Sequence, residues 1–297
     1  MIDVVFLGTG SMVPTSTRNH SGVFLRYKDE GLLFDCGEGI QRQLRIAKVS
    51  PARITRIFIS HWHGDHVLGI PGLIQSMAAN HYNRKLRIYG PKGTKEFVRK
   101  ILNAFICEDK VQMEVVDLKN NDVVKADGFK VRATELKHSA TTMAYEFIED
   151  DVRKINMAYL KKHNVSPGPI LKKLQQGKDI TINGKRIKVS EATTIKKGKK
   201  VVFINDTAFC EDCVKAAKGA DLLICESTFD ESFEEKAKDY MHLTSTQAAR
   251  IAKLANVKKL ILTHFSQRYK SVLKLKNQAK KIFKNVETAK DFLKISL

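Results

Sequence analysis

The stretch SHWHGDH, residues 60–66, places three histidines and one aspartate within six consecutive positions. Imidazole nitrogens and carboxylate oxygens are common zinc ligands. Gly64 favours a tight turn that brings these side chains into one cavity. His61 and His63 are spaced to share one ion, and Asp65 and His66 point to a neighbouring one. The sequence therefore predicts a metal site.

The elements that position this cluster are short. The apolar run RITRIFIS predicts a strand that ends at Ser60, directly before the histidines. Further strands are predicted at IDVVFLG, GVFLRY, GLLFDCG, LRIYG, FKVRATEL, AYEFIE, KVVFIND, DLLICE and KKLILTH. Apolar residues three or four positions apart predict helices within 39–48, 69–79, 94–105, 244–255 and 271–283, with Thr244 as an N-cap. This mixture predicts an α/β (α+β) fold in which helices cover sheets.

Charge is the most informative bulk property. The chain has 297 residues, with 52 Lys and Arg against 32 Asp and Glu, a net charge of +20. Such an excess attracts polyanions, above all nucleic acid. A lysine-rich solvated surface without a polyanionic partner is the alternative.

The number of cysteines and the length of the apolar runs indicate the cellular compartment in which the protein is expected. The five cysteines are an odd number, which argues against a disulfide framework and for a reducing compartment, so we expect a cytoplasmic protein. Cys210 and Cys213 form a lone CxxC, which we interpret as structural. No apolar run is long enough to cross a membrane, and MIDVVFLGTG predicts a first strand rather than a signal peptide.

Residues 149–192 differ from the rest of the chain. They lack sustained periodicity and carry Pro167, Gly168 and Pro169 at their centre. Between 151 and 190, ten Lys or Arg stand against two Asp or Glu. The composition predicts a basic, protruding insertion, although an ordinary surface loop would have the same appearance. Loops of this length in compact domains are usually functional or disordered.

The histidine cluster resembles the HxHxDH signature of the metallo-β-lactamase superfamily. This resemblance implies three more ligands at later strand ends, for which His138, Asp206 and His264 fit. It also implies that Asp35 in LLFDCGEG supports the site from behind the ligands. The implied centre holds two zinc ions bridged by Asp206, roughly 3.5–4 Å apart. Mn²⁺ can occupy similar sites.

Several other stretches resemble one family within this superfamily, the ribonuclease Z family of tRNA 3′-processing endoribonucleases. They are FLGTGSMVPTSTRNHSG, FDCGEG, CESTF, HLTSTQAA and HFSQRY, and they extend from residue 6 to 269. The resemblance implies a metallo-β-lactamase fold, a four-layer αββα sandwich. It also implies a single domain over 1–297, with residues 149–192 inserted as a flexible exosite arm.

The activity that this resemblance implies is zinc-dependent removal of the 3′ trailer from precursor tRNA. Cleavage after the discriminator base would leave a tRNA 3′-hydroxyl and a 5′-phosphate trailer. Asp65 is expected to hold the proton of the attacking water, and Glu226 and His242 are expected to protonate the leaving ribose oxygen. Cys225 departs from the family, which often has histidine there.

The resemblance also implies how substrate is held. The arm, with Gly168 and Pro169 at its tip, would grip the tRNA elbow from the partner subunit of a homodimer. Near the metals, the 3′ strand is expected to contact Arg18, Asn19, Ser266, Arg268 and Tyr269. These residues could instead serve turns and helix caps.

Two other functions fit the same sequence. One is a different hydrolase on the same scaffold, such as a small phosphodiesterase or thioesterase, because a fold does not fix its reaction. The other is a non-catalytic RNA-binding protein with structural zinc. The presence of Asp65, Glu226 and His242 argues against the second.

Overall fold

The computed structural model describes residues 1–106, 111–182 and 184–297. The chain divides into two compact units. The larger unit contains residues 1–125, 131–147 and 200–297, and the smaller one contains residues 126–130 and 148–199. The part of the chain that the structure describes has no helix long and apolar enough to span a membrane.

One seven-stranded sheet is built from the N-terminal part of the chain and its last strand. Its order is β18 (Lys294–Ser296), β1 (Ile2–Gly8), β2 (Gly22–Tyr27), β3 (Glu30–Phe34), β4 (Ile54–Phe58), β5 (Leu86–Gly90) and β6 (Met113–Asp117). The strands from β3 to β6 run parallel. Every residue of β4 is buried, as expected for a parallel strand that is covered on both faces.

A second seven-stranded sheet is built from the later part of the chain. Its order is β17 (Val286–Thr288), β16 (Leu260–Thr263), β15 (Leu222–Glu226), β14 (Lys200–Ile204), β9 (Thr142–Glu149), β8 (Phe129–Leu136) and β7 (Val123–Ala126). The strands from β14 to β17 are parallel. Parallel strands end at one edge of a sheet, so side chains that follow them can meet there.

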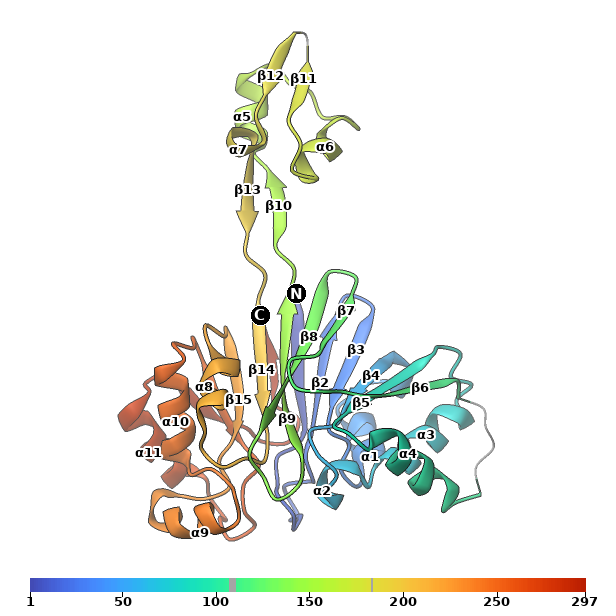
Figure 1. Cartoon of the computed structure of the whole chain (residues 1–297), viewed down its shortest axis with the longest axis vertical. Helices are drawn as coiled ribbons and strands as arrows, with labels where there is room; N and C mark the ends of the chain where they lie inside the picture. The colour runs from blue at the N-terminus through green and yellow to red at the C-terminus, as the bar shows by residue number, and fades with distance from the viewer. Residues whose placement is uncertain (107–110, 183) are drawn as a thin grey trace. The chain divides into compact units, whose positions relative to one another are not determined.

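Helices cover the outer face of each sheet (Figure 1). The first sheet packs against α1 (Ile40–Ile46), α3 (Ile70–Ala79) and α4 (Thr94–Asn103) in one apolar core cluster. The second packs against α8 (Glu211–Ala217), α10 (Ser245–Leu254) and α11 (Leu273–Ile282) in another. The short helices α2 (Gly64–Val67) and α9 (Glu234–Asp239) lie beside the loops of the larger unit.

Aromatic side chains join the inner faces of the two sheets. Phe34 of β3 stacks on Phe203 of β14 with ring centroids 3.7 Å apart. Tyr145 of β9 lies 5.2 Å from Phe58 of β4, and its hydroxyl donates to the Ile59 carbonyl at 2.6 Å. The layers are thus helix, sheet, sheet and helix. The predicted mixed fold and its αββα sandwich are confirmed.

The smaller unit has its own secondary structure and core. Strands β10 (Val152–Ile155) and β13 (Thr193–Lys196) pair antiparallel, as do β11 (Ile180–Ile182) and β12 (Lys185–Ile187). Helices α5 (Met157–Lys162), α6 (Leu171–Gln175) and α7 (Val189–Ala192) complete it. Its buried apolar residues are Leu160, Val165, Leu171, Leu174, Ile180, Ile187 and Ala192. The predicted insertion 149–192 falls within this unit, except that Asn183 lies outside the described residues.

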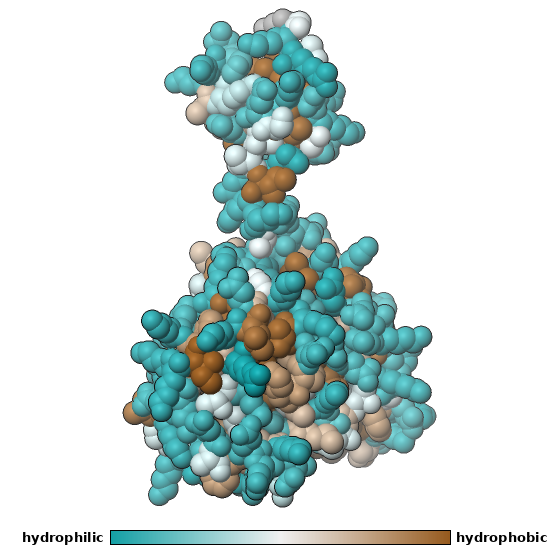
Figure 2. All heavy atoms as spheres, turned by 60° about the vertical axis from the view of Figure 1, so that its left-hand side comes forward, coloured by the Kyte–Doolittle hydropathy of each residue, from teal (hydrophilic) through white to brown (hydrophobic). Residues whose placement is uncertain are grey.

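The surface of the face seen in Figure 2 is mostly hydrophilic, with small hydrophobic patches. This agrees with a composition in which 28% of the residues are charged.

Candidate metal centre and proton-transfer pair

Loops that follow parallel strands gather the predicted ligands. His61 and His63 come directly after β4, Asp206 after β14, and His264 after β16. His138 follows β8. The structure thus brings together side chains that lie up to 203 positions apart in the chain, from His61 to His264.

Backbone conformation at this edge is unusual at two positions. Asp35 and His264 have φ angles of 59° and 58°, a left-handed region that non-glycine residues seldom adopt. Such conformations persist where the surroundings hold them, often at functional sites. Gly37 contributes in another way: a Cβ there would lie 2.4 Å from the Asp65 carbonyl oxygen. The loop after β3 therefore needs glycine to approach the histidine motif.

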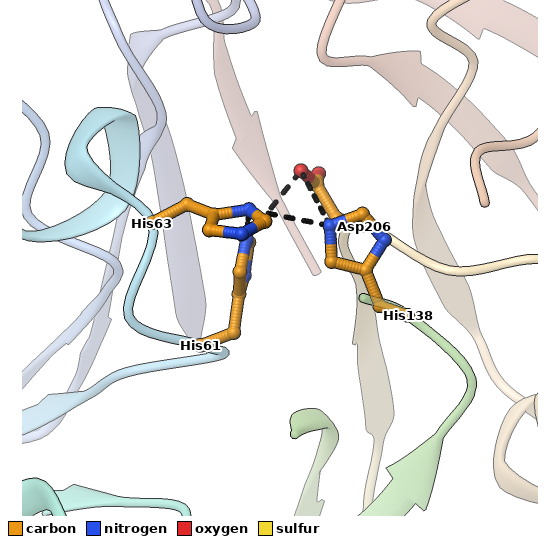
Figure 3. A group of neighbouring side chains, drawn as sticks. All are labelled: His61, His63, His138 and Asp206. Carbon is orange, nitrogen blue, oxygen red and sulfur yellow. Dashed lines mark hydrogen bonds and ion pairs between the residues drawn. The ribbon is translucent and has the colours of Figure 1, made fainter. Parts of the chain in front are cut away.

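A first group of potential ligand atoms comprises His61, His63, His138 and Asp206 (Figure 3). The Nδ1 atom of His63 lies 3.0 Å from Nε2 of His61 and 3.3 Å from Nε2 of His138. The Asp206 carboxylate lies 3.6 Å from the His61 ring nitrogen and 3.9 Å from that of His138. Three imidazoles and one carboxylate converge on one point.

A second group comprises Asp65, His66, Asp206 and His264, all buried. Nε2 of His66 lies 3.3 Å from Asp65 Oδ2 and 3.4 Å from Asp206 Oδ2. Nε2 of His264 lies 3.1 Å from Asp206 Oδ1. Asp206 belongs to both groups, so one carboxylate can serve two neighbouring ions.

Hydrogen bonds behind the histidines set which ring nitrogen faces the cluster. Nδ1 of His66 donates to Asp35 Oδ2 at 2.8 Å, and Nδ1 of His138 donates to the Met241 carbonyl at 3.0 Å. Nδ1 of His264 donates to Thr228 Oγ1 at 2.9 Å. Each bond leaves the Nε2 lone pair aimed inward, as metal ligation requires. Asp35 also accepts from the Ser60 backbone N–H at 2.7 Å.

Electrostatics favour a cation at this point. Burial lowers the pKa of His61 and of His138, which keeps them as the neutral imidazoles that metals bind. Burial alone would raise the pKa of Asp206, but the surrounding histidines, led by His264, hold it well below its usual range. Burial would lower the pKa of His66, but Asp65 and Asp206 raise it well above its usual value. These carboxylates attract positive charge, which a proton or a metal ion can supply.

Unpaired buried atoms test whether the residues fit a metal. Asp65 Oδ1, His66 Nε2 and Asp206 Oδ1 are buried and have no hydrogen-bond partner among the described residues. Leaving such atoms unsatisfied costs about 1–3 kcal/mol each. His66 Nε2 and Asp206 Oδ1 lie among the atoms of the second ligand group, and nitrogen and oxygen donors suit zinc. The donor set therefore fits metal binding.

The second predicted pair lies beside the metal groups. Nδ1 of His242 is 3.0 Å from Glu226 Oε1, and the Thr207 backbone N–H donates to the same oxygen at 2.9 Å. Thr228 Oγ1 donates to Glu226 Oε2 at 2.6 Å. Burial would lower the pKa of His242, but Glu226 and then Asp206 raise it to about 9. His242 thus faces a buried carboxylate that favours its protonated form.

A pocket of about 360 Å³ opens over these groups. Its lining includes His63, Asp65, His138, Asp206, His242 and His264, together with Ser266 and Arg268 from the predicted substrate-binding set. The walls are completed by residues that the sequence analysis did not single out, among them Met12, Val13, Thr228, Phe229, Lys236 and Tyr240. Met12, Val13, Thr228 and Phe229 lie in the quoted stretches FLGTGSMVPTSTRNHSG and CESTF, so the family resemblance marked their neighbourhood, whereas nothing marked Lys236 and Tyr240.

The other predicted substrate-binding residues lie elsewhere. Arg18 donates to the Tyr269 carbonyl, and the side-chain amide of Asn19 donates to the Glu38 carbonyl at 2.7 Å. The Tyr269 hydroxyl accepts from the Asp230 backbone N–H at 2.8 Å. These contacts hold loops in place, and none of the three residues lines the pocket. Gly168 and Pro169 belong to the smaller unit.

The CxxC pair is buried in the second-sheet core. The Sγ atoms of Cys210 and Cys213 lie 3.4 Å apart, and both thiols are free. Cys36 and Cys225 are also free and buried, while Cys107 lies outside the described residues. The surroundings of the pair agree with a packing role.

Comparison with known proteins gives close matches over the whole chain. Ribonuclease Z of Methanosarcina mazei is 39% identical, over 100% of this chain and 98% of its own length. Ribonuclease Z of a Picosynechococcus species is 41% identical, over 100% and 96%. Residues 2–288 match the family model described as "Anti-Pycsar protein Apyc1".

Solved structures agree with these matches. Human tRNase Z, short form, superposes with a TM-score of 0.69 at 30% identity, covering 99% of this chain and 98% of that one. The metallo-β-lactamase fold protein YhfI of Bacillus subtilis has a TM-score of 0.73 at 21% identity, with the same coverage, which supports the fold alone. The chain therefore belongs to the family that the matched model defines and to the ribonuclease Z family of hydrolases, which has the metallo-β-lactamase fold.

Proposed function

We propose that this protein is a zinc-dependent endoribonuclease that removes the 3′ trailer from precursor tRNA. Cleavage follows the discriminator base and leaves a tRNA 3′-hydroxyl and a 5′-phosphate trailer. The observation that carries the proposal is Asp206, which belongs to both ligand groups and lies 4.0 Å from the His242 ring. Its position joins a two-ion site to a proton donor within one pocket.

In this proposal, His61, His63 and His138 hold one ion, and Asp65, His66 and His264 hold the other, with Asp206 shared. When bound, a zinc pair lowers the pKa of water and neutralises charge on the attacked phosphoryl group. Asp35 orients His66 through its hydrogen bond. Mn²⁺ is a second candidate for the same donors.

Asp65 has a second task, which is to hold the proton of the attacking water. Its carboxylate lines the pocket, and its Oδ1 atom has no hydrogen-bond partner among the described residues. A carboxylate so placed accepts a hydrogen bond without first breaking another. Metal binding and proton acceptance thus involve different atoms of one side chain.

His242 and Glu226 act on the other side of the scissile bond. An alkoxide leaves far more readily when an acid donates a proton to it as the bond breaks. The imidazolium of His242 supplies this proton from the pocket wall, and buried Glu226 keeps it oriented and charged. Thr207 and Thr228 fix Glu226 in turn.

Substrate binding uses charge and shape. The +20 charge attracts RNA, and the smaller unit, with Gly168 and Pro169, serves as the exosite arm 149–192 that grips the folded part of tRNA. Ser266 and Arg268 contact the 3′ strand in the pocket, and Arg18, Asn19 and Tyr269 hold the loops through their hydrogen bonds. We place the enzyme in the cytoplasm as a homodimer, which rests on the family resemblance and the free cysteines.

The decisive experiment is incubation with a 3′-extended precursor tRNA. We expect one cut after the discriminator base, with a 3′-hydroxyl on the tRNA, and no cut after chelation. A product with a 3′-phosphate, or cleavage that persists with chelator, would exclude the proposal.

A second candidate is hydrolysis of small phosphodiesters, because a fold does not fix its reaction and both ligand groups border a pocket of about 360 Å³. Both activities would use the same metal site. The ratio of kcat/KM for precursor tRNA to that for bis-p-nitrophenyl phosphate distinguishes them. A ratio below one would favour the second candidate.

A further inference from the structure

An exposed tyrosine stands at the rim of the pocket. Tyr240 lines the pocket and is 60% exposed, whereas Phe229, the other aromatic side chain in the lining, is only 5% exposed. Single exposed apolar residues are common and need no explanation. This one is different because it lies in the same pocket as the ligand groups and His242.

The backbone around Tyr240 is fixed by the site itself. Tyr240 follows α9, and its N–H donates to the Lys236 carbonyl at 3.1 Å. The next residue, Met241, has a φ of 53° and accepts from His138 through its carbonyl. The His242 N–H donates to the Ala237 carbonyl at 2.8 Å. Tyr240 is therefore adjacent in the chain to Met241, whose carbonyl orients the candidate ligand His138, and it lies two positions before the proposed proton donor His242.

A cation accompanies the ring. Nζ of Lys236 lies 5.5 Å from the Tyr240 ring centroid, and Lys236 also lines the pocket. The guanidinium of Arg268, which also lines the pocket, lies 4.4 Å from the Phe233 ring centroid and 5.1 Å from that of Phe229. Arg268 is already stacked on protein rings. Tyr240 presents an aromatic surface that the described residues leave largely open.

We propose that the Tyr240 ring stacks on an unpaired nucleobase beside the scissile phosphate, while Lys236 contacts the adjoining backbone phosphate. This inference rests on the proposed function and adds a base-binding position to it. Unpaired bases stack on aromatic side chains with little sequence preference, and cations track the phosphates. Such a position suits an enzyme that must hold the single-stranded 3′ end of many different transcripts.

The hydroxyl is not needed for stacking. Within the described chain it makes no hydrogen bond, so Tyr240→Phe keeps the ring and is the matched control for Tyr240→Leu, which keeps an apolar side chain without a π face. Loss of one base–aromatic stack corresponds to about a 5- to 150-fold loss in binding. We expect Tyr240→Leu to lower kcat/KM for precursor tRNA in this range, mainly through KM, and Tyr240→Phe to stay within about twofold of the parent.

Abasic substrates separate stacking from general damage to the pocket. Two precursors are made, each with an abasic nucleotide on one side of the scissile phosphate. If Tyr240 stacks on one of these bases, the corresponding abasic precursor is a poor substrate for the parent enzyme, and Tyr240→Leu lowers its cleavage no further. Equal losses by Tyr240→Leu on the intact and both abasic precursors would overturn the proposal.

A binding measurement removes catalysis from the readout. In the presence of chelator, precursor tRNA carrying 2-aminopurine beside the cleavage point is titrated with the parent, Tyr240→Phe and Tyr240→Leu proteins. Stacking quenches the fluorophore, so we expect quenching with the first two proteins and at least fivefold weaker quenching with the third. Identical quenching by all three proteins would exclude Tyr240 as the stacking residue.

The outcomes also separate this proposal from the function on which it rests. If the parent protein does not cleave precursor tRNA, the proposed function is wrong. Suppose that the parent cleaves it, but that Tyr240→Leu lowers cleavage of the intact and abasic precursors equally and does not weaken quenching. Only the stacking position is then wrong. Lys236→Met tests the phosphate contact, and we expect it to reduce the salt dependence of binding by about one released counterion.

Discussion

Asp65 combines two proposed tasks in one carboxylate, because it belongs to the second ligand group and also lines the pocket. Its Oδ2 atom lies near His66 and His264, and its Oδ1 atom has no hydrogen-bond partner among the described residues. We expect Asp65→Ala to lower kcat/KM for precursor tRNA by at least about 10²- to 10⁴-fold, because a ligand and a proton acceptor are both removed. Metal content measured by mass spectrometry should fall by up to one ion per chain. Wild-type cleavage by this variant would contradict the mechanism.

His242 allows a test that depends on the leaving group. Ribose alkoxide needs a proton to leave, whereas p-nitrophenolate is stable without one. We expect His242→Asn to lower kcat for precursor tRNA by about 10²- to 10⁴-fold and to leave hydrolysis of bis-p-nitrophenyl phosphate nearly unchanged. Glu226→Gln should show the same selectivity with a smaller loss. Equal losses on both substrates would mean that His242 supports the metal site rather than the leaving group.

The residue scale also shows what the sequence could predict. His61, His63, Asp65 and His66 share one loop, so their spacing alone predicted a metal site. His138, Asp206 and His264 follow three different strands, and only the family resemblance singled them out. Thr228, whose hydroxyl lies between Glu226 and His264, falls in the quoted CESTF stretch but was not predicted as a site residue, because a threonine by itself does not indicate a role at a metal site.

At the scale of elements, the capping box of α10 is a measurable contribution. Thr244 Oγ1 accepts from the Gln247 N–H at 3.2 Å, and the Gln247 side chain accepts from the Thr244 N–H at 3.0 Å. We expect Thr244→Ala to lower the free energy of unfolding by about 1 kcal/mol, as measured by urea denaturation, because the hydroxyl that caps the Gln247 N–H is lost. Thr244→Ser, which keeps the hydroxyl, is the control. A loss of equal size in both variants would point to packing of the methyl group instead.

Elements with strong periodicity were predicted closely. The runs GVFLRY, LRIYG and FKVRATEL correspond to β2, β5 and β8 at both ends, and Thr244 is the N-cap of α10, as predicted. The short strands β17 and β18 were missed, because three residues carry no readable period and such strands form only by pairing with a neighbour. The small core of residues 160–192 was missed for the same reason: its apolar residues come from several short elements.

At the scale of the whole molecule, metal should stabilise the fold, because the ligands come from both sheets. His61 follows β4 of the first sheet, whereas Asp206 and His264 follow strands of the second. Binding at 100 to 1,000 times the dissociation constant adds about 3–4 kcal/mol. We expect chelation to lower Tm by about 5–15 °C in a thermal melt, and the shift should be smaller in Asp65→Ala. An unchanged Tm in the parent would argue against resident metal.

The smaller unit gives the last prediction, which concerns substrate selection. Because β10 and β13 pair from Val152 to Lys196, residues 157–191 can be replaced by a short Gly-Ser turn while that ladder is kept. We expect the shortened enzyme to lose most of its cleavage of precursor tRNA, through KM, and to hydrolyse bis-p-nitrophenyl phosphate at the parent rate.

A full-length variant tests charge alone: alanine at the exposed residues Lys161, Lys162, Lys172 and Lys173 leaves the buried cluster around Leu160 and Leu174 intact. If these lysines contact phosphates, the slope of log K against log salt should decrease by about 3 to 4. If both variants bind and cleave precursor tRNA like the parent, residues 149–192 are not the exosite, and the positive charge that attracts RNA must lie on the larger unit.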